Sequence, residues 1–206
     1  MTRPTADRHT LTSDASPHEG LEEQRALMRA VAAGDAAAYR ALCARYLGPI
    51  NGFAQRMLGN EAEGEEVAQE TFLRVWKDAG RYAPTAAVST WIYRIARNLC
   101  IDHLRRRKET SNRISQVDAV DRTGALLDRK QLASEVNRAL GELPERQRAA
   151  ICLVHYDGLS QAEAAGVLEV GTEALESLLA RGRRTLRKKL AGLQASAAES
   201  ADDQGA

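Results

Sequence analysis

A chain of 206 residues with 44% hydrophobic and 28% charged residues has the composition of a folded protein, which excludes a collagen-like or wholly disordered chain. The length allows one domain or two small ones. The formal net charge of +1 does not by itself indicate a nucleic-acid partner, so any such role depends on how charge is distributed along the chain.

Charge is segregated along the sequence. Residues 61–70 hold five glutamates and no basic residue, residues 91–108 hold six Lys or Arg against one Asp, and residues 172–190 hold six against two Glu. No run approaches the roughly 18–20 apolar residues that cross a bilayer, and residues 1–20 lack the apolar region of a signal peptide. The sequence therefore predicts a cytoplasmic protein.

The cysteines and histidines form no metal or redox motif. Cys43, Cys100 and Cys152 are odd in number and far apart, which favours buried small side chains over a disulfide framework or a zinc site, with a redox sensor as the alternative. No phosphate-binding, dinucleotide-binding or zinc-protease motif occurs, and no nucleophile elbow. The histidines are scattered: His9, His18, His103 and His155. We therefore expect no cofactor, no metal and no catalytic activity.

The N-terminal half begins with a segment, residues 1–20, that is expected to be disordered. Apolar periodicity then predicts a helix over 21–33 that stops at Gly34. Asp35 caps a second helix, and Gly48-Pro49 within it predicts a kink or short break, because proline removes a backbone donor and clashes with the preceding turn.

Two further helices complete a predicted first domain over residues 21–108. Asn60 caps a helix through residue 79, which Gly80 ends. Residues 82–89 read as a loop, and Thr90 caps a helix to about residue 108. Periodicity disappears over 109–126, where Thr, Ser, Asn, Asp and Gly are typical of a linker.

The predicted second domain covers residues 127–193. Its first helix is followed by one that opens at Pro144 and closes at Gly158. Ser160 and Glu163 match a capping box for a short helix to about residue 168, and after a turn Thr172 caps the last helix. Residues 194–206 are expected to be a disordered tail. With no strand pattern anywhere, the fold class is all-α, with two small helical domains joined by a flexible linker.

The last two helices indicate a helix-turn-helix, in which the second helix enters the major groove. Arg181, Arg184 and Lys188 recur at three- and four-residue steps, so they share a face that is able to follow phosphates. An ordinary helical hairpin with a solvated basic face is the alternative, since Lys and Arg also favour helix C-termini.

The basic helix of the first domain interleaves aromatic and basic residues. Trp91 and Tyr93, taken as exposed, alternate with Arg94, Arg97 and Asn98. Such a pattern suits single-stranded DNA, because bases stack on rings while guanidinium groups neutralise phosphates. The alternative is that Trp91 is a core anchor and residues 105–108 are a solvated helix end.

An acidic face is expected on the preceding helix. Glu66, Gln69, Glu70 and Leu73 lie at steps of three, one and three. A face that is mostly acidic with one apolar contact fits a basic helical partner. A solvated charged face is the alternative interpretation.

Three blocks of the sequence resemble conserved blocks of extracytoplasmic-function sigma factors, in the same order and around a linker: GNEAEGEEVAQETFLRVWKDA, STWIYRIARNLCIDHLRRRK and ELPERQRAAICLVHYDGLSQAEAAGVLEVGTEALESLLARGRRTLRKKL. The resemblance covers about residues 21–190. It implies a sigma factor that binds core RNA polymerase and directs it to promoters with minus-10 and minus-35 elements. An anti-sigma factor is a further expected partner.

The resemblance also implies roles for particular residues. The acidic helix would grip the clamp helices of the polymerase's largest subunit through Glu66, Gln69, Glu70 and Leu73. The melted minus-10 strand would be held by Tyr82, Trp91, Tyr93, Arg94, Arg97, Asn98 and Arg105. The minus-35 element would be read in the major groove by Arg146, Thr172, Glu173, Glu176, Ser177, Arg181, Arg184 and Lys188. Glu176 and Leu178 depart from the basic residues often found there, which leaves the minus-35 sequence open.

Two other classes of protein are compatible with part of the sequence. An operator-binding regulator would explain residues 172–190 but leave the acidic face and the aromatic basic helix without a role. A sigma-like mimic that sequesters an anti-sigma factor would not need Trp91, Asn98 or residues 105–107, which form a DNA surface.

Overall fold

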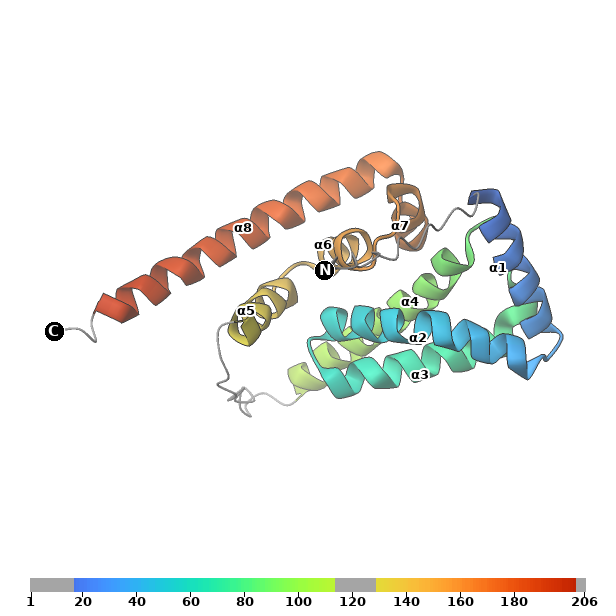
Figure 1. Cartoon of the computed structure of the whole chain (residues 1–206). Coiled ribbons are helices and arrows are strands. Elements are labelled where there is room, and N and C mark those ends of the chain that lie inside the picture. Colours follow the sequence, from blue (N-terminus) through green and yellow to red (C-terminus); the bar gives the residue numbers. More distant parts are fainter. Residues whose placement is uncertain (1–16, 114–128, 203–206) are drawn as a thin grey trace, which may run out of the picture.

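The computed structural model of the chain describes residues 17–113 and 129–202, and within these ranges it contains helices and no strand. The N-terminal domain comprises α1 (Pro17–Ala32), α2 (Ala36–Leu58), α3 (Glu61–Asp78), the short 3₁₀ turn η1 (Ala79–Arg81) and α4 (Val88–Arg113). Figure 1 shows α2, α3 and α4 running alongside one another, with α1 across one end. The all-α prediction is confirmed.

Local capping explains where several helices begin. The Asp35 carboxylate accepts hydrogen bonds from the amides of Ala37 and Ala38, and the Asn60 side chain accepts one from the amide of Glu63. Both predicted caps are therefore confirmed. The cap predicted at Thr90 is wrong, because α4 already begins at Val88 and Thr90 is buried in its first turn.

The interruption predicted at Gly48-Pro49 is absent, since α2 is continuous through Pro49. Both residues face solvent, where water is able to satisfy the carbonyl that proline leaves without a donor. Ile50 and Phe53 follow directly and are fully buried, so packing holds this part of α2 in helical form. Tertiary burial outweighs the local cost of the proline.

The C-terminal domain comprises α5 (Arg129–Gly141), α6 (Glu145–Ile151), the π-helical turn η2 (Cys152–Tyr156), α7 (Gln161–Leu168) and α8 (Thr172–Asp202). The predicted capping box is formed: Ser160 accepts from the amide of Glu163, and the Glu163 carboxylate accepts from the amide of Ser160. Glu169 adopts a left-handed conformation with φ 56° and makes the turn between α7 and α8.

Three predicted boundaries differ from the structure. Helix α1 begins at Pro17 rather than residue 21, α4 extends to Arg113, and α8 continues to Asp202 instead of ending at residue 193. Residues 192–202 are rich in alanine, so they prolong α8 by helix propensity. The remaining segments predicted to be disordered or linker, 1–16, 114–126 and 203–206, lie outside the described residues.

The two domains pack against each other. Helix α4 contacts α7, and α2 contacts α5, α6 and η2 (Figure 1). The buried hydrophobic residues form one cluster that includes members of both domains, among them Phe53 on α2 and Leu153 on η2. Within the N-terminal domain α2 and α3 cross closely at Gly64, where an added Cβ would lie 2.5 Å from Cγ of Gln55 and 2.9 Å from its backbone nitrogen. This packing sets the positions of the surfaces described next.

Candidate nucleic-acid interface

The acidic face of α3 is open to solvent. Glu66, Gln69 and Leu73 are exposed, and Glu70 is half-buried beside Arg74, with its Oε1 2.9 Å from Nε. These four predicted residues line a hollow of about 350 Å³ between α3 and α4. The structure therefore brings the predicted set together on one face.

Sequence reasoning missed three members of this region. His103 and Arg106 of α4 line the same hollow, and Nε2 of His103 lies 3.9 Å from Oε2 of Glu66. Trp76 is 39% exposed and lies one turn after Leu73, which is 52% exposed, so the two form an apolar edge beside the carboxylates. The three-residue step from Leu73 to Trp76 was the available signal; the helix pairing that brings in α4 was not visible in the sequence.

The loop before α4 is ordered by aromatic contacts. The rings of Tyr82 and Trp91 meet edge to face with centroids 5.6 Å apart, and the Tyr82 hydroxyl donates to the Ala86 carbonyl at 2.7 Å. Trp91 is half-buried, whereas Asn98 and Arg105 are exposed. Both interpretations of Trp91 therefore apply in part: it packs against Tyr82 as an anchor, and part of its side chain reaches the surface.

The expectation that Tyr93 is exposed is wrong, because its side chain is only 3% exposed. Its ring packs edge to face on Phe53 with centroids 5.5 Å apart. Burial is the largest cause that raises the Tyr93 pKa, and the nearby Asp157 carboxylate from the other domain adds to it. Position 93 thus lies on the buried side of α4.

Of the predicted basic residues on α4, Arg94 is engaged by the C-terminal domain and Arg97 is buried. Arg94 donates from Nη2 to the Gly166 carbonyl at 2.8 Å, and its Nη1 lies 3.6 Å from Oε1 of Glu169. Arg97 is only 8% exposed. Burial lowers the Arg97 pKa, Glu169 opposes that shift, and Arg146 and Arg94 add to it. Arg94 is thus paired with the C-terminal domain while its side chain stays 40% exposed, and the buried Arg97 donates from Nη1 to Oδ1 of Asn98 at 3.2 Å.

Helix α8 presents most of the third predicted set. Its exposed or half-buried members follow one another at three- and four-residue steps along the helix, from Glu173 to Ser177, Arg181, Arg184 and Lys188. Thr172 and Glu176 are exposed as well. Leu178 packs partly buried against the hydrophobic core, which accounts for an apolar residue at that position.

Arg146 is separated from this stripe. It lies on α6 and lines a hollow of about 940 Å³ between the domains, together with Arg107 and Lys108 of α4. Lys108 also pairs with Glu145 across the domains at 2.6 Å. The structure therefore does not bring Arg146 into one surface with α8, a separation that depends on how α6 faces the N-terminal domain.

The cysteines are distributed as expected in two cases of three. Cys100 and Cys152 are buried, and burial raises the pKa of each thiol to about 12. Cys43 is only half-buried, so it departs from the expectation. Across residues 17–113 and 129–202, no group of three or more His, Cys, Asp or Glu is placed to hold a metal ion. Nor does any helix in those ranges have the length and apolar character to cross a membrane.

Comparison with known proteins identifies the two domains. The family model for sigma-70 region 2 matches residues 42–110, and that for sigma-70 region 4 matches residues 133–186. The ECF RNA polymerase sigma factor SigW of Bacillus subtilis is 31% identical over 180 residues, which cover 81% of this chain and 96% of SigW. SigM of Mycobacterium tuberculosis, also an ECF RNA polymerase sigma factor, is 33% identical over 166 residues, covering 80% and 83% of the two chains.

A solved structure supports the same assignment. CnrH, determined in complex with the cytosolic domain of CnrY, superposes with a TM-score of 0.66 at 28% identity, and the match covers 82% of this chain and 97% of CnrH. The domain pair, the sequence relatives and this structural likeness agree. The chain belongs to the extracytoplasmic-function sigma factors of RNA polymerase and is a promoter-recognising factor of transcription initiation.

Proposed function

We propose that the acidic surface of α3 is where this sigma factor binds core RNA polymerase, through the clamp helices of the largest subunit. The surface is solvent-exposed and combines carboxylates with the apolar side chains of Leu73 and Trp76. Carboxylates would attract a basic helix and the apolar edge would add buried area on contact. The hollow between α3 and α4 offers a concave seat for such a helix.

The minus-10 strand is assigned to α4 and the loop before it. Exposed Asn98 and Arg105 and the half-buried Trp91 support this role, because a polar group, a cation and a ring together suit an unpaired base and its phosphate. Arg94 and Arg97 belong to the same helix and would join them after release from the C-terminal domain. Tyr82 supports the site by holding the loop against Trp91.

The minus-35 element is assigned to the exposed stripe of α8. Arg181, Arg184 and Lys188 are placed for phosphates, and the first turn, with Thr172 and Glu176, is placed for base edges. A glutamate carboxylate is able to accept from the amino group of cytosine, so a cytosine is the base that Glu176 would read. Arg146, which lies outside this stripe, is proposed as an additional phosphate contact after the domains separate.

An anti-sigma factor is proposed as the regulatory partner, on the ground that CnrH was determined with the cytosolic domain of CnrY. We propose that the polymerase supplies all catalytic chemistry and this chain supplies recognition. Because core polymerase and the chromosome are in the bacterial cytoplasm, the chain would act there.

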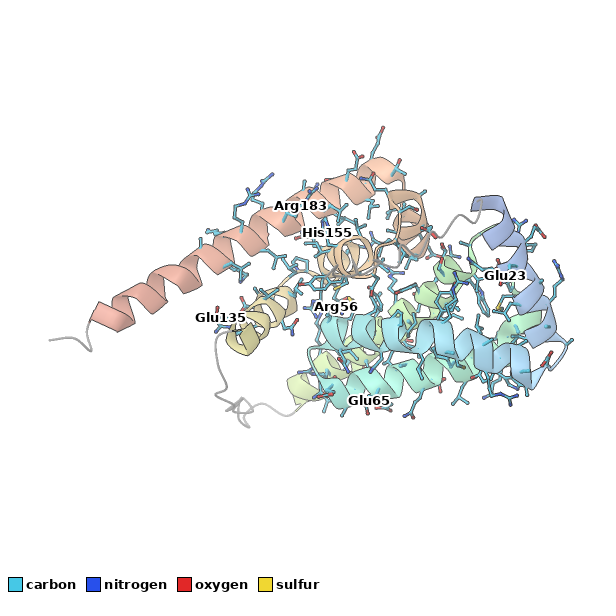
Figure 2. The ribbon with its side chains drawn as sticks, viewed as in Figure 1. Glu23, Arg56, Glu65, Glu135, His155 and Arg183 are labelled. Carbon is cyan, nitrogen blue, oxygen red and sulfur yellow. The ribbon has the colours of Figure 1, made fainter. Side chains whose placement is uncertain are left out.

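The observation that carries this proposal is the exposure of the acidic surface of α3 beside the apolar edge of Leu73 and Trp76. Glu70→Lys and Gln69→Ala should weaken retention of core polymerase and run-off transcription without changing helical content. Glu23→Lys is the matched control, since Glu23 is an exposed glutamate on α1 (Figure 2). Wild-type retention of core polymerase by both α3 variants would rule this surface out.

A further inference from the structure

The hollow of about 940 Å³ between the two domains is strongly basic. Arg107 and Lys108 of α4 line it from the N-terminal domain, and Arg146 and Arg148 of α6 line it from the C-terminal domain. Glu145 is the one carboxylate among the described residues that line it. With four cations and one carboxylate, the hollow has an excess of positive charge that would attract an anion.

The protein neutralises these cations only in part. Nζ of Lys108 lies 2.6 Å from Oε1 of Glu145, and Nη1 of Arg107 lies 3.5 Å from Oε2 of Glu63. Both pairs are open enough to solvent for water to screen them, so they exchange partners at little cost. Arg146 is exposed and has no ion pair among the described residues. An anion in the hollow is therefore able to contact Arg146 directly and to recruit the other two cations by exchange.

Arg148 places a buried charge at the wall of the hollow. It is 6% exposed, and its guanidinium donates to the carbonyls of Met57, Gly141 and Leu143. Its Nε is buried without a hydrogen-bond partner, and no carboxylate of the described residues pairs with it. Burial lowers the pKa of this guanidinium, because the charged form loses hydration. A buried cation without a counter-ion is costly, and an anion in the hollow would reduce that cost.

Most of the remaining lining is apolar. Leu58, Leu104, Leu143 and Pro144 belong to it. Sites for small molecules have volumes of about 300–1,000 Å³ and combine apolar walls with a few polar or charged groups. This hollow has that size and that composition, so it suits a ligand with both an anionic and an apolar part.

We propose that the hollow binds a phosphorylated small molecule of the nucleotide class, with its phosphate groups on Arg107, Lys108 and Arg146 and its apolar part against the leucines. Guanidinium groups match phosphate oxygens in a bidentate geometry, and lysine adds a point charge. The site goes beyond the proposed function, in which Arg107 and Lys108 have no role. The phosphate chemistry assigned to Arg146 serves here without DNA.

A compact polyanion fits the hollow better than a nucleic-acid strand does. The cations come from two domains and line one hollow, whereas a strand needs cations spaced along an open groove and aromatic rings for its bases. In the described part of the chain, no aromatic side chain lines the hollow. Two adjacent phosphate groups concentrate their charge where the cations gather.

Isothermal titration calorimetry of the full chain with ADP, in magnesium-free buffer, tests the site directly. Inorganic pyrophosphate and adenosine separate the two parts of the ligand: pyrophosphate should bind more weakly than ADP, and adenosine should not bind measurably. ADP should also raise the thermal unfolding midpoint of wild type, because it binds only the folded chain. Absence of binding by both ADP and pyrophosphate at millimolar concentration overturns the proposal.

Substitutions at the hollow should change the affinity in opposite directions. Arg146→Ala and Lys108→Ala, both at exposed positions, should each weaken ADP binding about tenfold through loss of a charge-assisted contact. Glu145→Gln should strengthen it about two- to fivefold, because it removes the carboxylate of the hollow and frees Lys108. Arg40→Ala and Lys77→Ala remove exposed cations outside the hollow, so these matched controls should bind ADP like wild type.

A gain of affinity in Glu145→Gln together with a loss in Arg146→Ala is a pattern that misfolding cannot produce. Equal affinity of all variants, or an equal loss in the two controls, would show that ADP binds elsewhere and would overturn the site. Tighter binding of a random single-stranded oligonucleotide that displaces ADP and needs the same two cations would make the hollow a nucleic-acid site instead. Retention of core polymerase tests the proposed function separately, so failure of one leaves the other standing.

Discussion

The two proposed DNA surfaces should fail at different steps of initiation. Arg181 and Arg184 are exposed on α8, and Asn98 is exposed on α4, so alanine at any of them removes little folded-state packing. Arg181→Ala or Arg184→Ala should weaken the closed promoter complex, in which DNA is still duplex. Asn98→Ala should leave closed complexes largely intact and reduce strand opening, because base capture offsets the cost of unstacking.

The magnitudes follow from the contacts that each residue can make. An exposed arginine that neutralises one phosphate adds about 0.9 to the slope of the logarithm of the binding constant against the logarithm of the salt concentration. Raising the salt from about 50 to about 200 mM should therefore weaken promoter binding by wild type about 3.5-fold more than binding by either arginine variant. Lowering the salt should strengthen promoter binding by the variants. Wild-type binding should gain more, so the difference in affinity between wild type and the variants should grow. Asn98 can make one neutral hydrogen bond to a base, worth about 0.5–1.5 kcal/mol, so opening should fall about two- to twelvefold.

Permanganate footprinting of unpaired thymines measures strand opening, and electrophoresis measures the amount of closed complex. Retention of core polymerase by each variant is the control for folding. A premelted minus-10 bubble should rescue transcription by Asn98→Ala only partly, because it removes the melting cost but not the missing contact. Trp91→Ala should behave similarly where the fold tolerates loss of the contact with Tyr82. Normal opening by Asn98→Ala, or equal binding and opening defects in both sets, would refute the assignment of surfaces.

Three further outcomes are expected. Gly64→Ala should destabilise the chain by about 1–3 kcal/mol in thermal unfolding, because its Cβ meets the Gln55 backbone, whereas Gly20→Ala, with open space around it, should be neutral or slightly stabilising. Burial raises the pKa of Asp157 from 3.8 to about 6, against the lowering effects of Arg56 and Tyr93. This group's contribution to stability is therefore full below about pH 3.8 and lost as pH rises through about 6, a dependence that Asp157→Asn should remove from denaturation curves. In filter binding, the free chain should bind duplex DNA weakly and with a steep salt dependence; nanomolar, sequence-specific affinity would contradict the sigma mechanism.

Local signals in the sequence predicted much of the helical framework. Asp35, Asn60 and the Ser160–Glu163 capping box work through atoms within three residues, so their geometry is readable from the chain itself. The acidic face of α3 was equally accessible, because helical periodicity alone places its residues together. Predictions of this kind depend on no distant part of the molecule.

The errors arise where distant segments meet. Tyr93 and Arg97 have the sequence context of a solvent-facing helix, but both are buried, and Tyr93 packs on Phe53 of α2. Pro49 stays in α2 because the residues after it are anchored in the core. The separation of Arg146 from the α8 stripe likewise depends on the face that α6 turns toward the hollow between the domains. No local pattern carries this information.

The docked arrangement leaves the three proposed surfaces accessible to different degrees. The acidic surface of α3 remains exposed while Arg94 of α4 is engaged by the C-terminal domain and Arg97 is buried, so the proposed polymerase contact is accessible in the docked arrangement. The stripe of α8 is exposed as well, so duplex recognition does not require the strand-binding face. The surface proposed for unpaired bases is accessible only in part: Arg97 is buried and Arg94 is paired with α7, whereas Asn98 and Arg105 are exposed.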